Sequence, residues 1–126
     1  MSKETMLEKK VWAVVGANQN PEKFGNKIYK RLKEKGYEVY PVNPVVESID
    51  GDICYKNLSS LPKIPDVINM VVAPDRGKPY IEEAAELGIK YVWFQPGTID
   101  REILILAKEK GIEALQSCVL VATENK

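Results

Sequence analysis

The sequence contains no histidine among its 126 residues. Histidine is the general base of Ser-His-Asp triads and Cys-His dyads, and it supplies the ligands of HExxH zinc sites. Its absence excludes all of these sites, and phosphohistidine intermediates with them. Few of the common hydrolytic mechanisms are open to a chain of this composition.

Cysteine is nearly as scarce, and the chain carries no net charge. Cys54 and Cys118 lie far apart without CxxC spacing, so neither a zinc ribbon nor a thioredoxin-like redox pair is predicted, and two reduced thiols are the expectation. Eighteen Lys and Arg residues balance eighteen Asp and Glu residues. We therefore expect no nucleic acid partner and no anionic membrane surface as a partner. Any recognition of an anion must be local.

Long apolar runs are absent as well. The apolar stretches are strand-sized, too short to span a membrane, and the charged segment Met1 to Lys10 lacks the apolar core of a signal peptide. We expect a soluble, cytoplasmic protein. A chain of this length buries roughly two-thirds of the surface that its unfolded form exposes. One domain over residues 1–126, with a core at about residues 10–120, is therefore sufficient.

What the sequence does contain is an alternation of helical and extended patterns. Three segments, at Gly36, Gly88 and Gly111, have Lys or Glu residues, then glycine, then a β-branched or apolar run. Glycine there closes a helix C-terminus in the left-handed conformation, and the apolar residues before each segment recur at helical spacing. The predicted strands are Val11 to Val15, Glu38 to Val42, Val67 to Val72, Tyr91 to Phe94, and Ile112 to Leu115.

This alternation predicts βαβ units. We expect a Rossmann-like three-layer α/β/α domain with a five-stranded, mostly parallel sheet. The pattern breaks between Glu47 and Pro65, where Asp50-Gly51-Asp52 and two prolines predict turns, with at most a short helix around Asn57 to Ser60. Trp93 and Phe94 are predicted to be core residues.

Ligands of open parallel sheets bind beyond the carboxyl ends of the strands. The first strand ends in Gly16-Ala17-Asn18, and Gly25 lies near the start of the following helix, whose N-terminus favours a phosphate. The spacing is neither GxGxxG nor Walker A. From spacing alone, a simple turn and a phosphate cradle are equally compatible with this segment.

Other strand ends narrow the choice of ligand. In a nicotinamide dinucleotide site, an acidic residue after the second strand binds the ribose hydroxyls, but this sequence has Asn43-Pro44 at that position. That pair offers an apolar face and an amide to adenosine, or else only ends the strand. After the third strand, Asp75 is the predicted helix N-cap, and Arg76 or Lys78 either faces a phosphate or stays solvated. Cys118 has no histidine to activate it, so inert packing is the expectation.

Taken together, these strand ends resemble the family of stand-alone CoA-binding proteins, which are related to the N-terminal domain of the succinyl-CoA synthetase α subunit. The resemblance extends from Val11 to about Leu120. The matching segments are Val14 to Gly25, Gly36 to Pro44, Tyr55 to Pro62 and Val92 to Gly97.

The resemblance implies a set of ligand contacts. The Gly16 loop and the segment from Lys23 to Asn26 would hold the pyrophosphate, Val42-Asn43-Pro44 and Val72-Ala73-Pro74 would flank the adenosine, and Gln95 to Gly97 would close the cleft. The candidate ligand-binding residues are Gly16, Ala17, Asn18, Lys23, Phe24, Gly25, Asn26, Val42, Asn43, Pro44, Val72, Ala73, Pro74, Arg76, Gln95, Pro96 and Gly97.

The sequence departs from that family in three places. Asn18 replaces a common serine, Val45 replaces a common basic residue after the Asn-Pro pair, and Ser117-Cys118 replaces an Arg-Cys pair. The synthetase subunit also carries its phosphorylated histidine in a second domain, which has no counterpart in this sequence. A ligase activity of this chain alone is therefore not expected.

The main hypothesis is a CoA-binding or acyl-CoA-binding module without catalysis of its own. It is compatible with a homo-oligomer or with an accessory subunit of an acyl-CoA enzyme. The alternatives are an NAD-type oxidoreductase or acyl-transfer enzyme, and a nucleotide-sensing or interaction module.

Overall fold

The computed structural model describes residues 2–124. Its main sheet has five parallel strands in the order β2-β1-β5-β6-β7. They are β1 (Val11–Val15), β2 (Glu38–Val42), β5 (Val67–Met70), β6 (Tyr91–Phe94) and β7 (Glu113–Gln116). The predicted α/β class and parallel sheet are confirmed.

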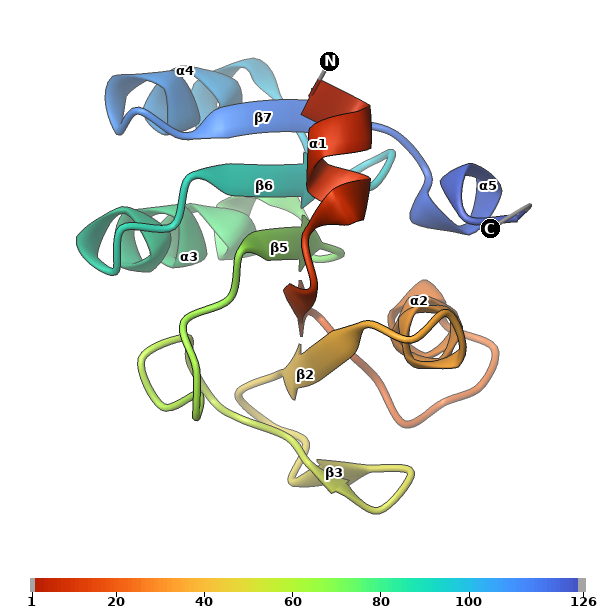
Figure 1. Ribbon diagram of the computed structural model, residues 1–126. Coiled ribbons are helices and arrows are strands. Elements are labelled where there is room, and N and C mark those ends of the chain that lie inside the picture. Colours follow the sequence, from red (N-terminus) through yellow and green to blue (C-terminus); the bar gives the residue numbers. More distant parts are fainter. Residues whose placement is uncertain (1, 125–126) are drawn as a thin grey trace.

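Helices cover both faces of this sheet (Figure 1). On one face α3 (Pro74–Glu86) and α4 (Arg101–Glu109) bury a core that includes Ile68, Met70 and Phe94. On the other face α1 (Ser2–Glu8), α2 (Phe24–Glu34) and α5 (Val119–Ala122) bury Trp12 and Trp93. Trp93 and Phe94 are fully buried, as predicted. No helix within residues 2–124 is long and apolar enough to cross a membrane.

Two strands differ in their bounds from the prediction: β5 at its end, and β7 at both ends, since it runs from Glu113 to Gln116 rather than from Ile112 to Leu115. β5 ends at Met70 rather than Val72 because the chain turns away to begin α3, with Ala73 as its N-cap and Pro74 as its first residue. Asp75, the predicted N-cap, lies in the first turn of the helix instead. β7 starts at Glu113 because the backbone N–H of Ile112 donates to Ala107 O (2.9 Å) and so closes α4.

The segment between β2 and β5 holds a small antiparallel hairpin of β3 (Ser48–Ile49) and β4 (Asp52–Ile53). Asp50 and Gly51 take positive φ values of 52° and 83° at its tip, which confirms the turn predicted there. Residues 57–60 form turns rather than a short helix. The Glu83 carboxylate of α3 holds them by accepting bonds from the backbone N–H groups of Leu58 (2.9 Å) and Ser59 (3.1 Å).

Two terminal helices were not predicted. Met6 of α1 is fully buried, and the carbonyl oxygen of Leu7 accepts a bond from the Tyr37 hydroxyl (2.6 Å). At the other end, Arg31 of α2 donates to Leu120 O (2.7 Å) and so ties α5 to α2. Short helices of this kind are stabilised by tertiary contacts rather than by propensity, so a local pattern does not predict them.

Candidate functional site

The strand order reverses between β1 and β5. The connection after β1 leads to α2 on one face of the sheet, and the connection after β5 leads to α3 on the other face. Such a switch point opens a crevice beyond the strand ends. Two adjoining cavities lie there and share Gly16, Asn43, Val72 and Arg76. We call them the loop hollow and the α3 groove. The loop hollow, of about 500 Å³, adds residues 18, 23–25, 71, 73, 95, 96, 98 and 118. The α3 groove, of about 690 Å³, adds residues 44, 45, 56, 57, 79, 80, 82, 83 and 86.

The loop hollow is built on a close contact between two glycines. Gly16 follows β1 with a φ of +100°, and a Cβ placed on it would lie 2.9 Å from Val72 Cγ1. A Cβ placed on Gly25 would lie 2.0 Å from the carbonyl oxygen of Gly16. The start of α2 therefore packs directly on the end of β1, and only glycine at both positions allows it.

The N-terminus of α2 opens into the same hollow. Lys23 is the N-cap without a side-chain capping bond, and its carbonyl oxygen accepts from the N–H groups of Asn26 and Lys27, both at 3.1 Å. The first N–H groups of a helix have no intrahelical acceptor, and the helix dipole places partial positive charge there. This end of α2 thus offers backbone donors to an anion in the hollow.

Two asparagine side chains hold the surrounding loops. Asn26, buried to 2% exposure, donates its amide to Asn18 O (2.8 Å) and to Gln19 O (3.3 Å). Asn43 donates to Ala17 O (2.9 Å), and its Oδ1 accepts from Val45 N (2.9 Å). The side chains of Asn26 and Asn43 are therefore already engaged within the protein, and their structural contribution is to fix the Gly16 loop against the turn after β2.

Gln95 and Cys118 form the far wall of the loop hollow. Gln95 accepts a bond from Val119 N (2.8 Å) through Oε1 and directs Nε2 toward Cys118 Sγ (3.6 Å). Burial raises the pKa of the Cys118 thiol, but the Val121 and Leu120 N–H groups and the Gln95 amide outweigh it and leave that pKa below its usual value. Both cysteines are free, as expected. Cys118 nevertheless faces the hollow rather than the core.

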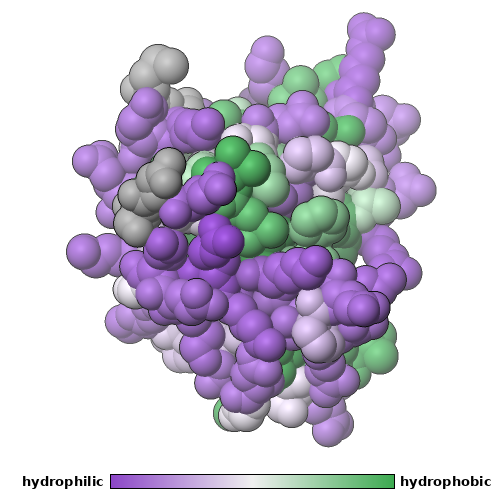
Figure 2. Space-filling view, turned by 90° about the vertical axis from the view of Figure 1, so that its right-hand side faces the viewer, coloured by the Kyte–Doolittle hydropathy of each residue, from purple (hydrophilic) through white to green (hydrophobic). Residues whose placement is uncertain are grey.

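Apolar side chains are exposed on the face of the molecule that carries α2 and α5. Figure 2 shows hydrophobic side chains gathered on the face that carries α2 and α5, framed by hydrophilic residues. Phe24 on α2 is 60% exposed and Val121 on α5 is 68% exposed.

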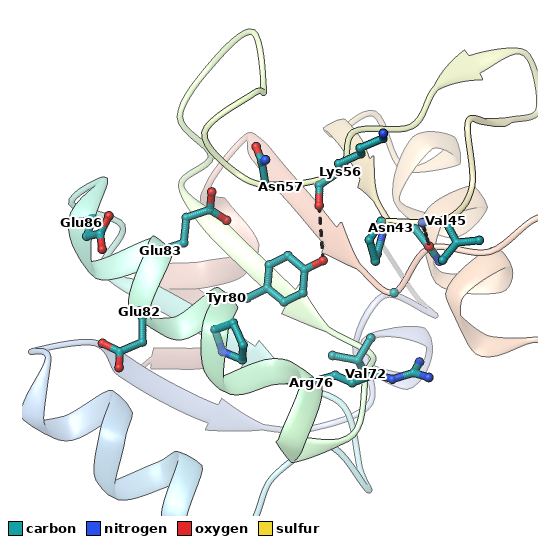
Figure 3. A pocket seen from close by; sticks show the side chains of 13 residues that line it. Asn43, Val45, Lys56, Asn57, Val72, Arg76, Tyr80, Glu82, Glu83 and Glu86 are labelled. Carbon is teal, nitrogen blue, oxygen red and sulfur yellow. Dashed lines mark hydrogen bonds between the residues drawn. The ribbon is translucent and has the colours of Figure 1, made fainter.

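The α3 groove combines an aromatic ring with separated charges (Figure 3). Tyr80 lies in the middle, and its hydroxyl reaches toward Lys56 O at 3.5 Å. Lys56 and Arg76 lie toward one side, while Glu82, Glu83 and Glu86 lie along the other. Within residues 2–124, the side chains of Lys56 and Arg76 form no ion pair, whereas Glu82 pairs with Lys110 (3.1 Å).

The structure brings most of the predicted site residues to these cavities. Those that line them are Gly16, Asn18, Lys23, Phe24, Gly25, Asn43, Pro44, Val72, Ala73, Arg76, Gln95 and Pro96. Ala17 and Val42 are fully buried behind the lining, and Asn26, Pro74 and Gly97 do not line it either. Ligand contact by any of these residues stays a prediction.

Sequence reasoning missed one wall of the site. Lys56, Asn57, Pro79, Tyr80 and Thr98 line the cavities without having been candidates. Tyr80 lies one helical turn after Arg76, so the i, i+4 spacing on α3 was the signal that could have found it. Lys56 comes from an irregular segment that no local pattern places.

Comparisons with known proteins show the family and the fold of this chain. A family model described as a CoA binding domain matches residues 10–124. A solved structure of a conserved hypothetical protein from Pyrococcus furiosus is 44% identical, with a TM-score of 0.85, over 90% of this chain and 98% of that one. A hypothetical protein from Pyrococcus horikoshii is 36% identical, with a TM-score of 0.90, over 97% and 87% of the two chains.

Curated relatives are of two kinds. The uncharacterised protein YneT of Bacillus subtilis is 28% identical over 95% of this chain and 90% of its own length. The α subunit of ADP-forming acetate–CoA ligase II from Pyrococcus furiosus is 38% identical over 64% of this chain, but the match spans only 18% of that subunit. Because the family model matches residues 10–124, nearly all of the residues that the structure describes, the chain belongs to the CoA-binding domain family.

Proposed function

We propose that this chain is a cytoplasmic protein that binds coenzyme A or an acyl-CoA through the ADP moiety, at the carboxyl ends of β1, β2 and β5. It would not catalyse a reaction on its own. Its role would be that of a carrier, a sensor or an accessory subunit of an acyl-CoA enzyme. The contact between Gly16 and Gly25 is the observation that carries this proposal, because it places bare backbone at the mouth of a helix N-terminus.

The loop hollow fits a pyrophosphate. The start of α2 lines it with backbone N–H groups, and Lys23 and Arg76, which also line it, form no ion pair within residues 2–124. Charge-assisted hydrogen bonds of this kind are about twice as strong as neutral ones. Together, the backbone donors and the two cations would neutralise most of the charge of a diphosphate.

The α3 groove fits an adenosine. Pro44, Val72, Pro79 and Tyr80 give it apolar and aromatic walls of the kind that enclose a flat ring. The groove joins the loop hollow at Gly16, so a nucleotide could occupy both cavities at once.

The residues around the loop hollow support binding rather than catalysis. Its titratable side chains are those of Lys23, Arg76 and Cys118. Among residues 2–124, no carboxylate or imidazole lines this cavity beside the thiol to act as a general base. The acetate–CoA ligase activity named for some relatives belongs to proteins of which this chain matches a small part.

Calorimetric titration with CoA, dephospho-CoA, ADP and NAD tests the proposal. We expect micromolar binding of CoA, equivalent to about 8 kcal/mol, and weaker binding of NAD, because the turn after β2 has Asn43 where a ribose-binding carboxylate would stand. Arg76→Gln should weaken CoA and ADP by about tenfold, the loss of one charge-assisted bond. Lys108→Gln, an exposed cation on α4 away from the crevice, is the matched control. Absence of CoA binding at millimolar ligand, or tighter binding of NAD than of CoA, would contradict the proposal.

A further inference from the structure

The turn after β2 leaves an uncharged position at the adenosine end of the site. Val45 lines the α3 groove and is 84% exposed. In nucleotide-binding α/β sheets, the residues after the second strand lie beside the ribose of the adenosine. If CoA occupies the crevice as proposed above, its ribose and 3′-phosphate lie near Val45. The side chain of a valine cannot bind a phosphate.

A cation is available across the groove from that valine. Lys56 follows Tyr55, whose backbone is hydrogen-bonded at the end of the edge strand β2. Tyr55 N donates to Pro41 O (2.9 Å), and Asn43 N donates to Tyr55 O (2.8 Å). The same two bonds therefore fix the positions of Lys56 and of the Asn43 turn relative to each other. Figure 3 shows the Lys56 ammonium on the side of the groove where Asn43 and Val45 lie.

The chain beyond Lys56 is fixed as well. Glu83 of α3 accepts bonds from Leu58 N (2.9 Å) and Ser59 Oγ (2.9 Å). The backbone of Lys56 is thus held on both sides, while its ammonium group has no carboxylate partner among residues 2–124. A cation on a fixed support without an internal partner is suited to receive an external anion.

The two cations of the α3 groove, Lys56 and Arg76, lie at different ends of the proposed ligand. Arg76 lines both cavities, next to Gly16 and Val72, and so lies at the pyrophosphate end. Lys56 lines the α3 groove alone. The carboxylates of Glu82, Glu83 and Glu86 occupy the opposite side and repel a phosphate from it, which leaves the Lys56 side for a second phosphate group.

We propose that Lys56 binds the ribose 3′-phosphate of CoA and is the residue by which this protein distinguishes CoA from dephospho-CoA. A phosphate monoester carries between one and two negative charges at neutral pH, with three acceptor oxygens. Its contact with an ammonium group is a charge-assisted hydrogen bond, and dephospho-CoA lacks it.

Calorimetric dissociation constants for CoA and dephospho-CoA measure this discrimination. The wild type should prefer CoA by at least about tenfold, the equivalent of one charge-assisted bond. Lys56→Met, which keeps the apolar stem, should abolish the preference by weakening CoA alone. Arg76→Gln should weaken both ligands by the same factor, and Lys90→Met, at an exposed lysine just before β6, should change neither.

A relocated charge provides the second test. Val45→Lys, introduced into the Lys56→Met protein, should restore part of the preference for CoA, because both positions line the same side of the groove. Binding of dephospho-CoA at the wild-type level serves as the internal check that each variant is folded.

The outcomes separate this inference from the proposed function. A wild-type protein that binds neither ligand overturns both. A wild type that binds the two equally, a Lys56→Met protein that keeps its preference for CoA, or one that loses both ligands to the same extent, overturns the role of Lys56 and leaves CoA binding intact.

Discussion

For Gly25→Ala, the packing in the structure and helix propensity predict opposite changes in the free energy of unfolding. Gly25 is the second residue of α2, in ordinary helical backbone rather than at positive φ. Alanine is favoured over glycine in a helix interior by up to about 1 kcal/mol. Judged from local structure alone, the change would stabilise the protein.

The packing against β1 reverses that expectation. The added Cβ would lie 2.0 Å from Gly16 O, 3.0 Å from Gly16 C and 3.2 Å from Ala17 Cα. Carbon atoms that are not bonded are most stable about 3.5 to 4.0 Å apart. All three atoms belong to backbone, so no side chain can rotate away and the helix itself must move. We expect a cost at or above the top of the range for overpacking, about 3 kcal/mol or more.

Urea denaturation followed by tryptophan fluorescence measures this cost, since Trp12 and Trp93 are both fully buried. With an m-value of about 1–3 kcal/mol per molar, the midpoint should fall by roughly 1–3 M. Gly36→Ala is the control. Gly36 has a φ of 89°, and a Cβ there would meet no atom of residues 2–124 within 4 Å apart from its chain neighbours, so only backbone strain of about 1–2 kcal/mol applies. If Gly25→Ala costs no more than Gly36→Ala, the glycine contact does not define the loop hollow.

Three further predictions concern other parts of the molecule. Asn69 is fully buried, and neither of its amide atoms has a partner within residues 2–124, so Asn69→Leu should raise the free energy of unfolding by about 1–3 kcal/mol in urea titrations; a lower stability would show that the amide is satisfied. Hydrogen bonds from Lys33 and Tyr29 hold the pKa of Asp52 below its usual value. Its contribution to stability is therefore present above the unfolded pKa of about 3.9 and is lost as pH falls through the lower folded pKa. The difference in free energy of unfolding between the wild type and Asp52→Asn should accordingly shrink in acid. The pKa of Cys118 is lowered while burial raises that of Cys54, so iodoacetamide near neutral pH should modify Cys118 first, and mass spectrometry that finds Cys54 modified first would contradict this assignment.

The sheet and its carboxyl edge could be predicted because both depend on local pattern. Val11–Val15, Glu38–Val42 and Tyr91–Phe94 are apolar or β-branched runs bounded by turn residues, and all three strands have the predicted bounds. Parallel connection then places the residues that follow each strand at one edge, whatever their separation in sequence. This is why Gly16, Val72 and Gln95 could be grouped before any contact was known.

The rest of the site depends on contacts between distant segments. Lys56 reaches the groove because Tyr55 pairs with Val42, and Glu83 is taken up in bonds to a turn 24 residues earlier. Neither pairing leaves a periodic signal. The asparagines also show that a side chain predicted to touch a ligand can instead hold the loop, since hydrogen-bond partners are decided by tertiary structure.

A chain without net charge can still bind an anion if its charges are sorted locally. Two of the three carboxylates that line the α3 groove are already engaged: Glu82 with Lys110, and Glu83 with backbone N–H groups. The ammonium and guanidinium groups of Lys23, Lys56 and Arg76 form no ion pair within residues 2–124. An incoming phosphate therefore does not have to displace an internal carboxylate from these cations. The favourable electrostatic field is confined to the crevice, because the chain as a whole is neutral. Added salt should therefore lower the affinity for the ligand by screening these local charges, while the association rate, which no long-range attraction raises, should change little.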